Sequence, residues 1–482
     1  MNKNIIIALD LGSSKISAMM AQRTEDGKLE ILNCQTIHHK PKDTPIRNGV
    51  VNNKSIVTSN IQEIISRLRN HVLLTGRNIT SAYIGIGGRT LTSKVFCVEK
   101  EYEQDTELDE QELRNLEQMA KDQMEQRGNI IYEVIPQEFN LDDVEIVNPE
   151  GCTARKVKAR FLIVSSKIAF EERITPATSR VPLAQQGCVI SAIAEANFVM
   201  TDHEKEMGCA MINFGAETTS IVVYKNGFIR HVAVVPFGSN SISEDLTTLR
   251  LTSNQAEEMK RKFGYAMVDC VQKSKKITIQ LPGQTSIETN QIEVAKIIQA
   301  RIDEIMDQVC KEIDESGFFS DLSDGIVITG GGSQLHSIEQ FVAFKTGMTV
   351  RKADFSELVQ PNVDPQWIRP ENSVLLGLLY NAETEDECTT PKIIPQEVPE
   401  SPKAKDDPGV TQIASHTSST ETDSSNGRHP EQEKTNTDNS GRKGKGRLGN
   451  LIQKASQKAG AFAEEFFFQD TDDHFTDDQK NK

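Results

Sequence analysis

Several patterns that mark particular protein classes are scarce or missing in this chain of 482 residues. Its eight cysteines include no C-x-x-C pair, which argues against a zinc site or a disulfide framework and favours reduced thiols. The sequence contains no run of about 18 apolar residues, the length that spans a membrane. Asp10 interrupts the first apolar run, so no signal peptide is expected. The net charge of −16 leaves no basic footprint for a nucleic-acid partner. The length predicts roughly two to four domains in a soluble, acidic, intracellular protein.

A glycine-containing turn near the N-terminus is the first candidate for a binding site. A short apolar run ends at Asp10, and Gly12, Ser13, Ser14 and Lys15 turn the chain before a second apolar run. Glycine allows the bend, and the small serines leave backbone N–H groups open to an anion. Lys15 adds positive charge, while Asp10 offers an oxygen to a hydrated magnesium ion. Taken alone, these residues are equally compatible with an ordinary β-turn.

The same order of strands and turns occurs again later in the chain. A strand over Gly208–Asn213 leads into the small-residue turn Phe214–Thr219, and Asn226-Gly227 then separates two more strands, as Asp26-Gly27 does in the first copy. Such dipeptides are typical of two-residue hairpins. Two hairpin turns that face each other across a cleft can hold the β- and γ-phosphates of a nucleotide from both sides. A chance double hairpin is the alternative.

A third turn, Gly330–Ser333, follows the β-rich run Gly325–Thr329 and precedes a helical pattern that begins at Leu335. A strand, glycines and a helix in this order predict backbone that lies against a base or phosphate at a helix N-terminus. A long amphipathic helix over 298–313 is expected between the second and third turns. Its apolar stripe faces the core or, alternatively, forms a dimer seam.

The other patterns indicate an α/β protein with an inserted unit. Strands in the first part of the chain are followed by a helix whose apolar positions run from Val57 to Leu68. Residues 83–165 form a small unit of their own, in which Asp109 and Glu112 are a pair typical of a helix start.

The three turns in this order resemble the first phosphate, second phosphate and adenosine motifs of the actin and sugar-kinase superfamily. Within it, the chain resembles the FtsA family of bacterial cell-division proteins, because the insert falls where that family carries its extra subdomain. The segments that carry the resemblance are Leu9–Ile16, Arg47–Val51, Asn213–Gly238 and Val327–Leu335. The resemblance implies an α/β, two-lobed actin-like ATPase fold with an inserted small α+β subdomain, a disordered linker and a C-terminal amphipathic helix.

The expected domain boundaries follow from this resemblance. The first lobe is expected over 1–82, with 166–195 and about 360–382, and the inserted subdomain over 83–165. The second lobe is expected to have a core over 196–243 and 325–359 and an outer subdomain over 244–324. A linker over 383–445, an amphipathic helix over 446–468 and an acidic tail over 469–482 complete the chain.

The resemblance also implies a site for ATP and Mg2+. It places Asp10 at the metal through water, and Glu195 where a glutamate polarises attacking water in the related MreB filaments. Glu195 is alternatively a helix-start carboxylate favoured by the helix dipole. The nucleotide-binding residues that the resemblance implies are Asp10, Gly12, Ser13, Ser14, Lys15, Asn213, Gly215, Thr218, Thr219, Glu257, Lys260, Gly330, Gly331, Gly332 and Ser333.

Two residues of the second turn depart from the family's usual D-x-G-x-G-T-T pattern. Asn213 removes a carboxylate that would hold the water shell of magnesium. Glu217 places a side chain where glycine lets the backbone approach phosphate. A carboxylate ~4 Å from a phosphate would repel it by ~4 kcal/mol, unless Glu217 points away or magnesium intervenes. Nucleotide binding is therefore expected, but with slow hydrolysis at most.

The composition changes after Tyr380. Residues 381–441 contain no Phe, Trp or Tyr and are rich in polar residues, which predicts a disordered linker. Beyond it, apolar residues spaced by three and four positions, with basic residues along one flank, predict a helix that lies on a membrane surface. Packing of this helix on its own domain is the alternative. The expected membrane-binding residues are Arg447, Leu448, Leu451, Ile452, Lys454, Lys458, Phe462 and Phe466.

The resemblance implies an adaptor that polymerises and tethers the division machinery to the cytoplasmic face of the cell membrane at the septum. The implied partners are the C-terminal peptide of the tubulin-like protein FtsZ, docked on 244–324, further copies of the chain, an anionic lipid surface, and later division proteins at 83–165. A sugar-kinase-like phosphotransferase, an actin-fold chaperone ATPase and a pilus-assembly adaptor are the alternatives.

Overall fold

The structure is a computed structural model, and it describes residues 4–40, 44–71, 74, 76–125, 128–181, 183–271, 274–280, 286–383, 387–391 and 468–469. Its contacts divide the chain into two units. The first comprises Met1–Thr278, Ile287–Lys392 and Asp470–Lys482, and the second comprises Ile279–Ser286 and Ile393–Gln469. All three glycine turns belong to the first unit.

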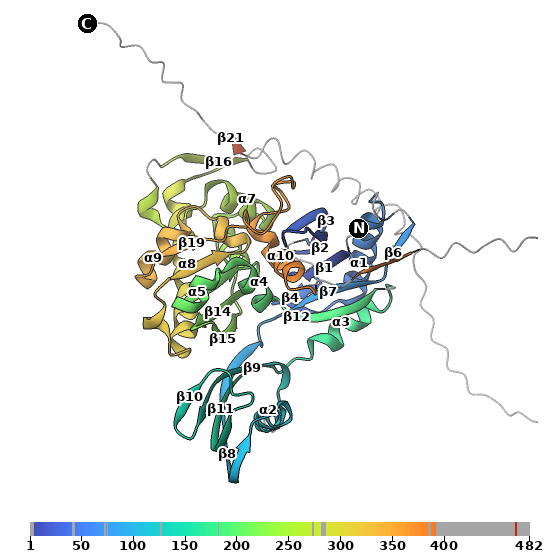
Figure 1. The fold of residues 1–482 in the computed structure, drawn as a ribbon. Coiled ribbons are helices and arrows are strands. Elements are labelled where there is room, and N and C mark those ends of the chain that lie inside the picture. The colour runs from blue at the N-terminus through green and yellow to red at the C-terminus, as the bar shows by residue number, and fades with distance from the viewer. Residues whose placement is uncertain are drawn as a thin grey trace, which may run out of the picture. The chain divides into compact units, whose positions relative to one another are not determined.

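A five-stranded sheet carries the first turn (Figure 1). Its order is β12 (Ala184–Ile190), β7 (Ser81–Ile86), β1 (Ile5–Leu11), β2 (Lys15–Arg23) and β3 (Leu29–His38). The hairpins β1–β2 and β2–β3 are antiparallel, as the sequence predicts, whereas β1 pairs with β7 in parallel. Consecutive residues of β1 are buried, so both faces of this strand are covered. Helices α1 (Lys54–Arg69) and α10 (Ser373–Tyr380) pack on the sheet.

A nine-stranded sheet carries the second and third turns. Its order is β10 (Val144–Ile146), β9 (Ile130–Leu141), β11 (Thr153–Ser166), β8 (Thr92–Glu107), β15 (Phe228–Val235), β14 (Thr219–Lys225), β13 (Cys209–Phe214), β18 (Ile326–Thr329) and β19 (Val350–Lys352). The four strands from the insert therefore continue the sheet of the second and third turns, through the pairing of β8 with β15. They also form a separate small core with α2 (Glu110–Glu125) (Figure 1). The expected start of the insert at 83 is wrong, because Tyr83–Ile86 lie in β7 of the five-stranded sheet.

A polar contact fastens the insert to β15. The guanidinium of Arg230 forms an ion pair with Glu138 of β9 and donates a hydrogen bond of 3.0 Å to Oε1 of Gln137. The Ser93 hydroxyl of β8 accepts a hydrogen bond of 2.7 Å from the Val232 amide. We call these five residues the insert seam.

Further hairpins, strand pairs and helices belong to the first unit. They are the hairpin β4 (Ile46–Arg47) and β5 (Val50–Val51), the pair β6 (Arg77–Ile79) and β20 (Thr389–Pro391), and the helices α3 (Phe170–Thr178), α4 (Ser191–Val199), α5 (Asp202–Met207), α6 (Ser239–Leu246), α7 (Ser253–Phe263), α8 (Gln291–Glu315) and α9 (Ile338–Thr346). Strands β16 (Lys276–Gln280) and β17 (Ser286–Asn290) precede α8. The apolar stripe of α8 is buried, so the interpretation as core is confirmed.

Helices α4 and α10 cross each other between the two sheets, and their backbones approach closely. α4 contacts β13 and β14, while α10 contacts β1 and β7. Gly377 makes the crossing possible, because a Cβ atom there would lie 2.6 Å from the carbonyl oxygen of Ala194. An alanine at this position would therefore push the helices apart.

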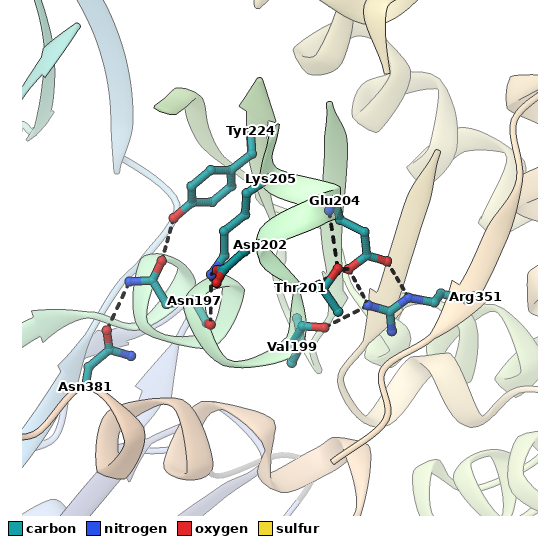
Figure 2. Close-up of polar contacts among 9 residues, drawn as sticks. All are labelled: Asn197, Val199, Thr201, Asp202, Glu204, Lys205, Tyr224, Arg351 and Asn381. Atoms are coloured by element: carbon teal, nitrogen blue, oxygen red, sulfur yellow. Dashed lines mark hydrogen bonds and ion pairs between the residues drawn. The ribbon is translucent and has the colours of Figure 1, made fainter. Parts of the chain in front are cut away.

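Polar side chains hold the crossing on the side of the second sheet, as Figure 2 shows. Asn197 of α4 accepts a hydrogen bond of 2.5 Å from the Tyr224 hydroxyl and donates one of 3.0 Å to Asn381 beyond α10. Nearby, Arg351 of β19 forms a two-pronged ion pair of 2.6 Å with Glu204 of α5 (Figure 2). Such planar pairs fix geometry as well as charge, so α4 and α5 are held firmly against the second sheet.

One prediction about the third turn is wrong. A 3-10 turn, η5 (Gly331–Gln334), follows β18, and α9 begins only at Ile338. Leu335 is extended and Ser337 is left-handed, so helical backbone cannot run on from the glycines. The glycines consequently lie at the start of a short 3-10 helix and not at the N-terminus of an α-helix.

The C-terminal predictions fall largely outside the described residues. Within 446–468 the structure describes only Phe468, which begins β21 (Phe468–Gln469). The expected start of the linker at 383 is wrong, because β20 pairs with β6 and the buried Cys388 exchanges backbone hydrogen bonds with Ile5 and Thr80. The rest of the linker and the amphipathic helix stay predictions. Among the helices of the described residues, none is long and apolar enough to cross a membrane.

Candidate functional site

The first turn closes the β1–β2 hairpin. Leu11 pairs with Ile16, and a Cβ atom on Gly12 would lie 2.9 Å from the carbonyl oxygen of Lys15, so the bend requires glycine. The Ser14 carbonyl accepts a hydrogen bond of 2.8 Å from the His39 amide, which fixes the turn to the end of β3. Asp10, the last polar residue of β1, is largely removed from water, and burial raises its pKa to about 6, partly offset by Lys15.

The amine of Lys15 lies between two segments that are far apart in sequence. Its Nζ donates a hydrogen bond of 2.7 Å to Oδ1 of Asn372, in the 3-10 turn η6 (Pro370–Asn372). Burial lowers the pKa of Lys15, while the charges of Asp10 and Glu371 act in the opposite direction. The sequence gives no sign that 371–373 belong to the site, since this segment lacks a motif and contacts the turn only through the fold.

The second turn closes the β13–β14 hairpin in the same way. Phe214 pairs with Thr219, and a Cβ atom on Gly215 would lie 2.6 Å from the carbonyl oxygen of Thr218. The hydroxyl of Thr219, implied above as nucleotide-binding, is buried and donates a hydrogen bond of 2.8 Å to the Phe237 carbonyl. Thr218 stays beside it in the turn.

Glu195 is fully buried and bridges the two sheets. Its Oε2 accepts a hydrogen bond of 2.6 Å from Nδ2 of Asn213 at the end of β13, and its Oε1 accepts one from the hydroxyl of Ser373 at the start of α10. Burial raises the pKa of Glu195 to about 7, and the charge of Asp10 adds to this rise. The first turn of α4 contains no acidic residue, so the interpretation of Glu195 as a helix-start carboxylate is wrong.

The third turn packs directly on the second. Gly330 has φ +83°, and a Cβ atom there would lie 2.2 Å from Oδ1 of Asn213. A Cβ atom on Gly332 would lie 2.8 Å from Cβ of Phe214. Gly331 differs from both, because the nearest atom to its Cβ position is Cβ of Glu371 at 3.8 Å. Ser333 is buried and bonded to the Gly330 carbonyl, so Gly331 alone offers open space on this turn.

Glu257 and Lys260 of α7 reach the same region through α6. The amine of Lys260 donates a hydrogen bond of 2.9 Å to the Ser239 carbonyl and forms an ion pair of 2.6 Å with Glu257. Cβ of Ser239 is 3.5 Å from the Cβ position of Gly332. Burial lowers the pKa of Lys260, and Glu257 acts in the opposite direction.

The three turns, from two sheets, thus surround a small group of buried and half-buried polar side chains that we call the loop junction. Its members are Asp10, Lys15, Glu195, Asn213, Asn372 and Ser373. It contains two carboxylates and one amine. Among the residues that the structure describes, no group of three or more His, Cys, Asp or Glu side chains could hold a metal ion by itself.

Comparison with known proteins gives consistent results for two parts of the chain. Residues 210–377 match the family model of cell division protein FtsA, and residues 88–165 match that of the SHS2 domain inserted in FtsA. A cell division protein FtsA from Porphyromonas gingivalis is 27% identical over 393 residues, covering 78% of each chain. Its counterpart from Neisseria meningitidis is 28% identical over 386 residues, covering 78% of this chain and 90% of the relative.

A solved structure shares the fold. A chain of the PilM-PilN type IV pilus biogenesis complex matches with a TM-score of 0.56 and 14% identity, covering 77% of this chain and 97% of the other. At this identity the match concerns the fold alone. The two family models in their chain order and the several FtsA relatives establish more: the chain belongs to the FtsA family of cell-division proteins and has an actin-like ATPase fold.

Proposed function

We propose that the chain is an ATP-binding cell-division protein that polymerises and tethers the FtsZ ring to the cytoplasmic membrane at the septum. The observation that supports this most is the loop junction, where turns from two sheets meet around Asp10 and Glu195. A ligand held there contacts both sheets, so its binding energy can select one arrangement of the two lobes. A polymer contact built on that arrangement would then depend on nucleotide.

The residues of the loop junction fit a magnesium nucleotide. Lys15 is the cation that acts on Asp10, while the partners of Glu195 are Asn213, Ser373 and, through its charge, Asp10. Carboxylates are oxygen ligands of the kind that magnesium prefers. Mg2+ usually keeps several waters and binds through one or two carboxylates together with phosphates, which suits Asp10 acting through water. When bound, the ion would neutralise phosphate charge. Gly12, Ser13, Ser14, Gly215 and Thr218 would surround the phosphates, and Gly331 would leave room for the adenosine.

Slow hydrolysis is part of the proposal. Each oxygen of Glu195 already accepts one hydrogen bond, from Asn213 or Ser373, which leaves fewer acceptor sites to orient a water. An aspartate at 213 could not donate such a bond. We therefore expect ATP turnover well below the ~10 per second of an ordinary enzyme, and faster turnover in Asn213→Asp. A wild-type rate near ~10 per second would contradict the proposed adaptor role.

The membrane and partner assignments rest on the sequence and on the family. The segment 446–468 would lie on anionic lipid with its apolar stripe inward, reversibly as one helix and firmly as a polymer through avidity. The FtsZ peptide would dock on 244–324, and the insert would serve later division proteins. The match to a pilus-assembly complex concerns fold only, so it does not favour the alternative role.

Pelleting with liposomes, with and without ATP, tests the proposed function. We expect the wild-type chain to pellet with anionic vesicles and to form filaments on lipid in the presence of ATP. The double variant Leu451→Glu, Phe462→Glu should keep ATP binding and lose the lipid. Pelleting of that variant to the wild-type extent would mean that the segment is not the anchor.

A further inference from the structure

The side chain of Glu217 makes a contact that its position in the second turn does not suggest. Its Oε2 accepts a hydrogen bond of 2.6 Å from the backbone amide of Asn48, which lies 169 residues earlier. Asn48 belongs to the β4–β5 hairpin, next to the first turn. The carboxylate therefore connects the second turn with the first-lobe side of the loop junction by a charge-assisted bond.

The turn that donates this bond is held rigidly. Asn48 and Gly49 both have left-handed backbone, with φ +48° and +73°, and a Cβ atom on Gly49 would lie 2.8 Å from Cα of Gly88. The Asn48 carbonyl accepts a hydrogen bond of 3.1 Å from the Arg89 amide. The Gly49 amide donates one of 3.3 Å to the hydroxyl of Ser13. Two successive amides of one turn thus hold Ser13 of the first loop and Glu217 of the second.

The backbone that carries Glu217 is fixed as well. The carbonyl oxygens of Gly215 and Ala216 accept hydrogen bonds of 2.9 and 2.7 Å from the amides of Ser239 and Asn240. Gly238 must be glycine here, since its Cβ atom would lie 2.6 Å from the Ala216 carbonyl. With both ends anchored, the bond from Asn48 to Glu217 sets the distance between the second turn and the β4–β5 turn.

We propose that Glu217 is a positioning residue that clasps the second turn to the Asn48 amide and so prearranges the two phosphate-binding turns before ligand enters. The carboxylate is directed to a backbone donor, and the partial positive charge of that amide offsets part of the repulsion expected of a glutamate near phosphate. Glu217 affects ligand affinity indirectly, because it sets the position of the second turn. This last step, unlike the clasp itself, rests on the proposed nucleotide-binding function.

Hydrogen–deuterium exchange of the nucleotide-free full-length chain tests the clasp directly. The matched variants are Glu217→Ala, which removes the acceptor, and Glu217→Gln, which keeps an acceptor oxygen without the charge. We expect the segment around Asn48 to exchange about tenfold faster in Glu217→Ala, as loss of a hydrogen bond to a charged group implies. Glu217→Gln should stay near the wild type. Equal exchange in Glu217→Ala and the wild type, or equal acceleration in both variants, would overturn the clasp.

Titration with magnesium-ATP supplies the second readout. The clasp predicts unchanged affinity in Glu217→Gln and several-fold weaker binding in Glu217→Ala, because the turn is no longer prearranged. If Glu217 instead faced the phosphate, both variants would bind ATP more tightly by a similar factor, and the proposal would fail. If no form of the chain binds ATP, the proposed function fails, and the exchange experiment still decides the clasp.

Discussion

Glu138 at the insert seam and Glu195 at the loop junction are both carboxylates largely removed from water, but their neighbours differ. Glu138 faces Arg230, whose guanidinium holds the pKa of this carboxyl below its usual range. Glu195 faces Asn213, Ser373 and, further off, Asp10, and its pKa rises to about 7. A buried charge with its own cation is a structural element, whereas a buried carboxylate without one is costly to the empty protein.

This difference in neighbouring charges gives the insert seam and the loop junction different roles. Phe228 and Phe318 flank Arg230 at 5.1 and 5.3 Å from their ring centroids, so its charge is enclosed on all sides by protein. The seam is complete and holds the insert to the second sheet. At the loop junction the amine of Lys15 acts on Asp10 and donates to Asn372, and Glu195 has polar partners without a cation. A magnesium nucleotide at the junction, as proposed above, would bring the cation that Glu195 lacks.

The largest expected effect lies at the seam. Arg230→Met should lower the free energy of unfolding by about 3 kcal/mol, because it removes the main cationic partner of the half-buried Glu138 and leaves only the more distant charge of Arg160. Urea unfolding measures this loss. The control is Arg155→Ala, which breaks an exposed pair of 2.6 Å with Asp105 and should cost at most about 1 kcal/mol. Similar losses in both variants would show that the seam is no more than a surface contact.

The next effect is a pH dependence of the nucleotide-free, magnesium-free protein. The folded pKa of Glu195, about 7, exceeds its ordinary value of 4.5, so the folded chain keeps a proton that the unfolded chain has lost. Stability should therefore fall as pH rises from 4.5 to 7, by at most about 3 kcal/mol, and then level off. Glu195→Gln should lack this part of the fall, since Ser373 can reverse its hydrogen bond. Asp10, whose pKa rises to about 6, should leave a smaller fall in the variant, so a slope equal to that of the wild type would assign the titration elsewhere.

A smaller effect is expected directly beneath Glu195. Gly377→Ala should cost about 1–3 kcal/mol by overpacking, because the new methyl would meet the Ala194 carbonyl at 2.6 Å. Gly87→Ala is the matched control, since no atom lies within 4 Å of its Cβ position. Thermal unfolding compares the two variants. If they are equally stable, the helix crossing is looser than its geometry indicates.

Local chemistry explains which parts of the fold the sequence predicts. Asn226 and Gly227 adopt the left-handed backbone that a two-residue hairpin needs, with φ +55° and +75°, so the strands around them could be placed from a dipeptide. The helix predicted after the third turn begins later than expected, because Leu335 is extended and Ser337 is left-handed. The spacing of apolar residues does not reveal either backbone conformation. Local sequence patterns therefore predict most of the strand order within each hairpin. They do not predict the contacts between the two sheets.

The contacts that build the loop junction join segments that are far apart in the sequence. Lys15 meets Asn372 across 357 residues, and Glu195 meets Ser373 across 178. The sequence named one partner of each pair and missed the other, because only the crossing of α4 and α10 brings them together. Likewise, Glu217 stood out as a departure from a motif, but its direction could be known only from the position of Asn48.

A calorimetric titration of magnesium-ATP into the wild type and Gly331→Val tests the central claim most directly. A side chain at 331 meets no protein atom nearer than 3.8 Å at its Cβ position, so the variant should fold with the wild-type melting temperature. We expect the wild type to bind with a Kd on the order of micromolar, equivalent to about 8 kcal/mol, and the variant not to bind. Equal affinity in the two proteins, or no binding to the wild type, would contradict a nucleotide site at the loop junction.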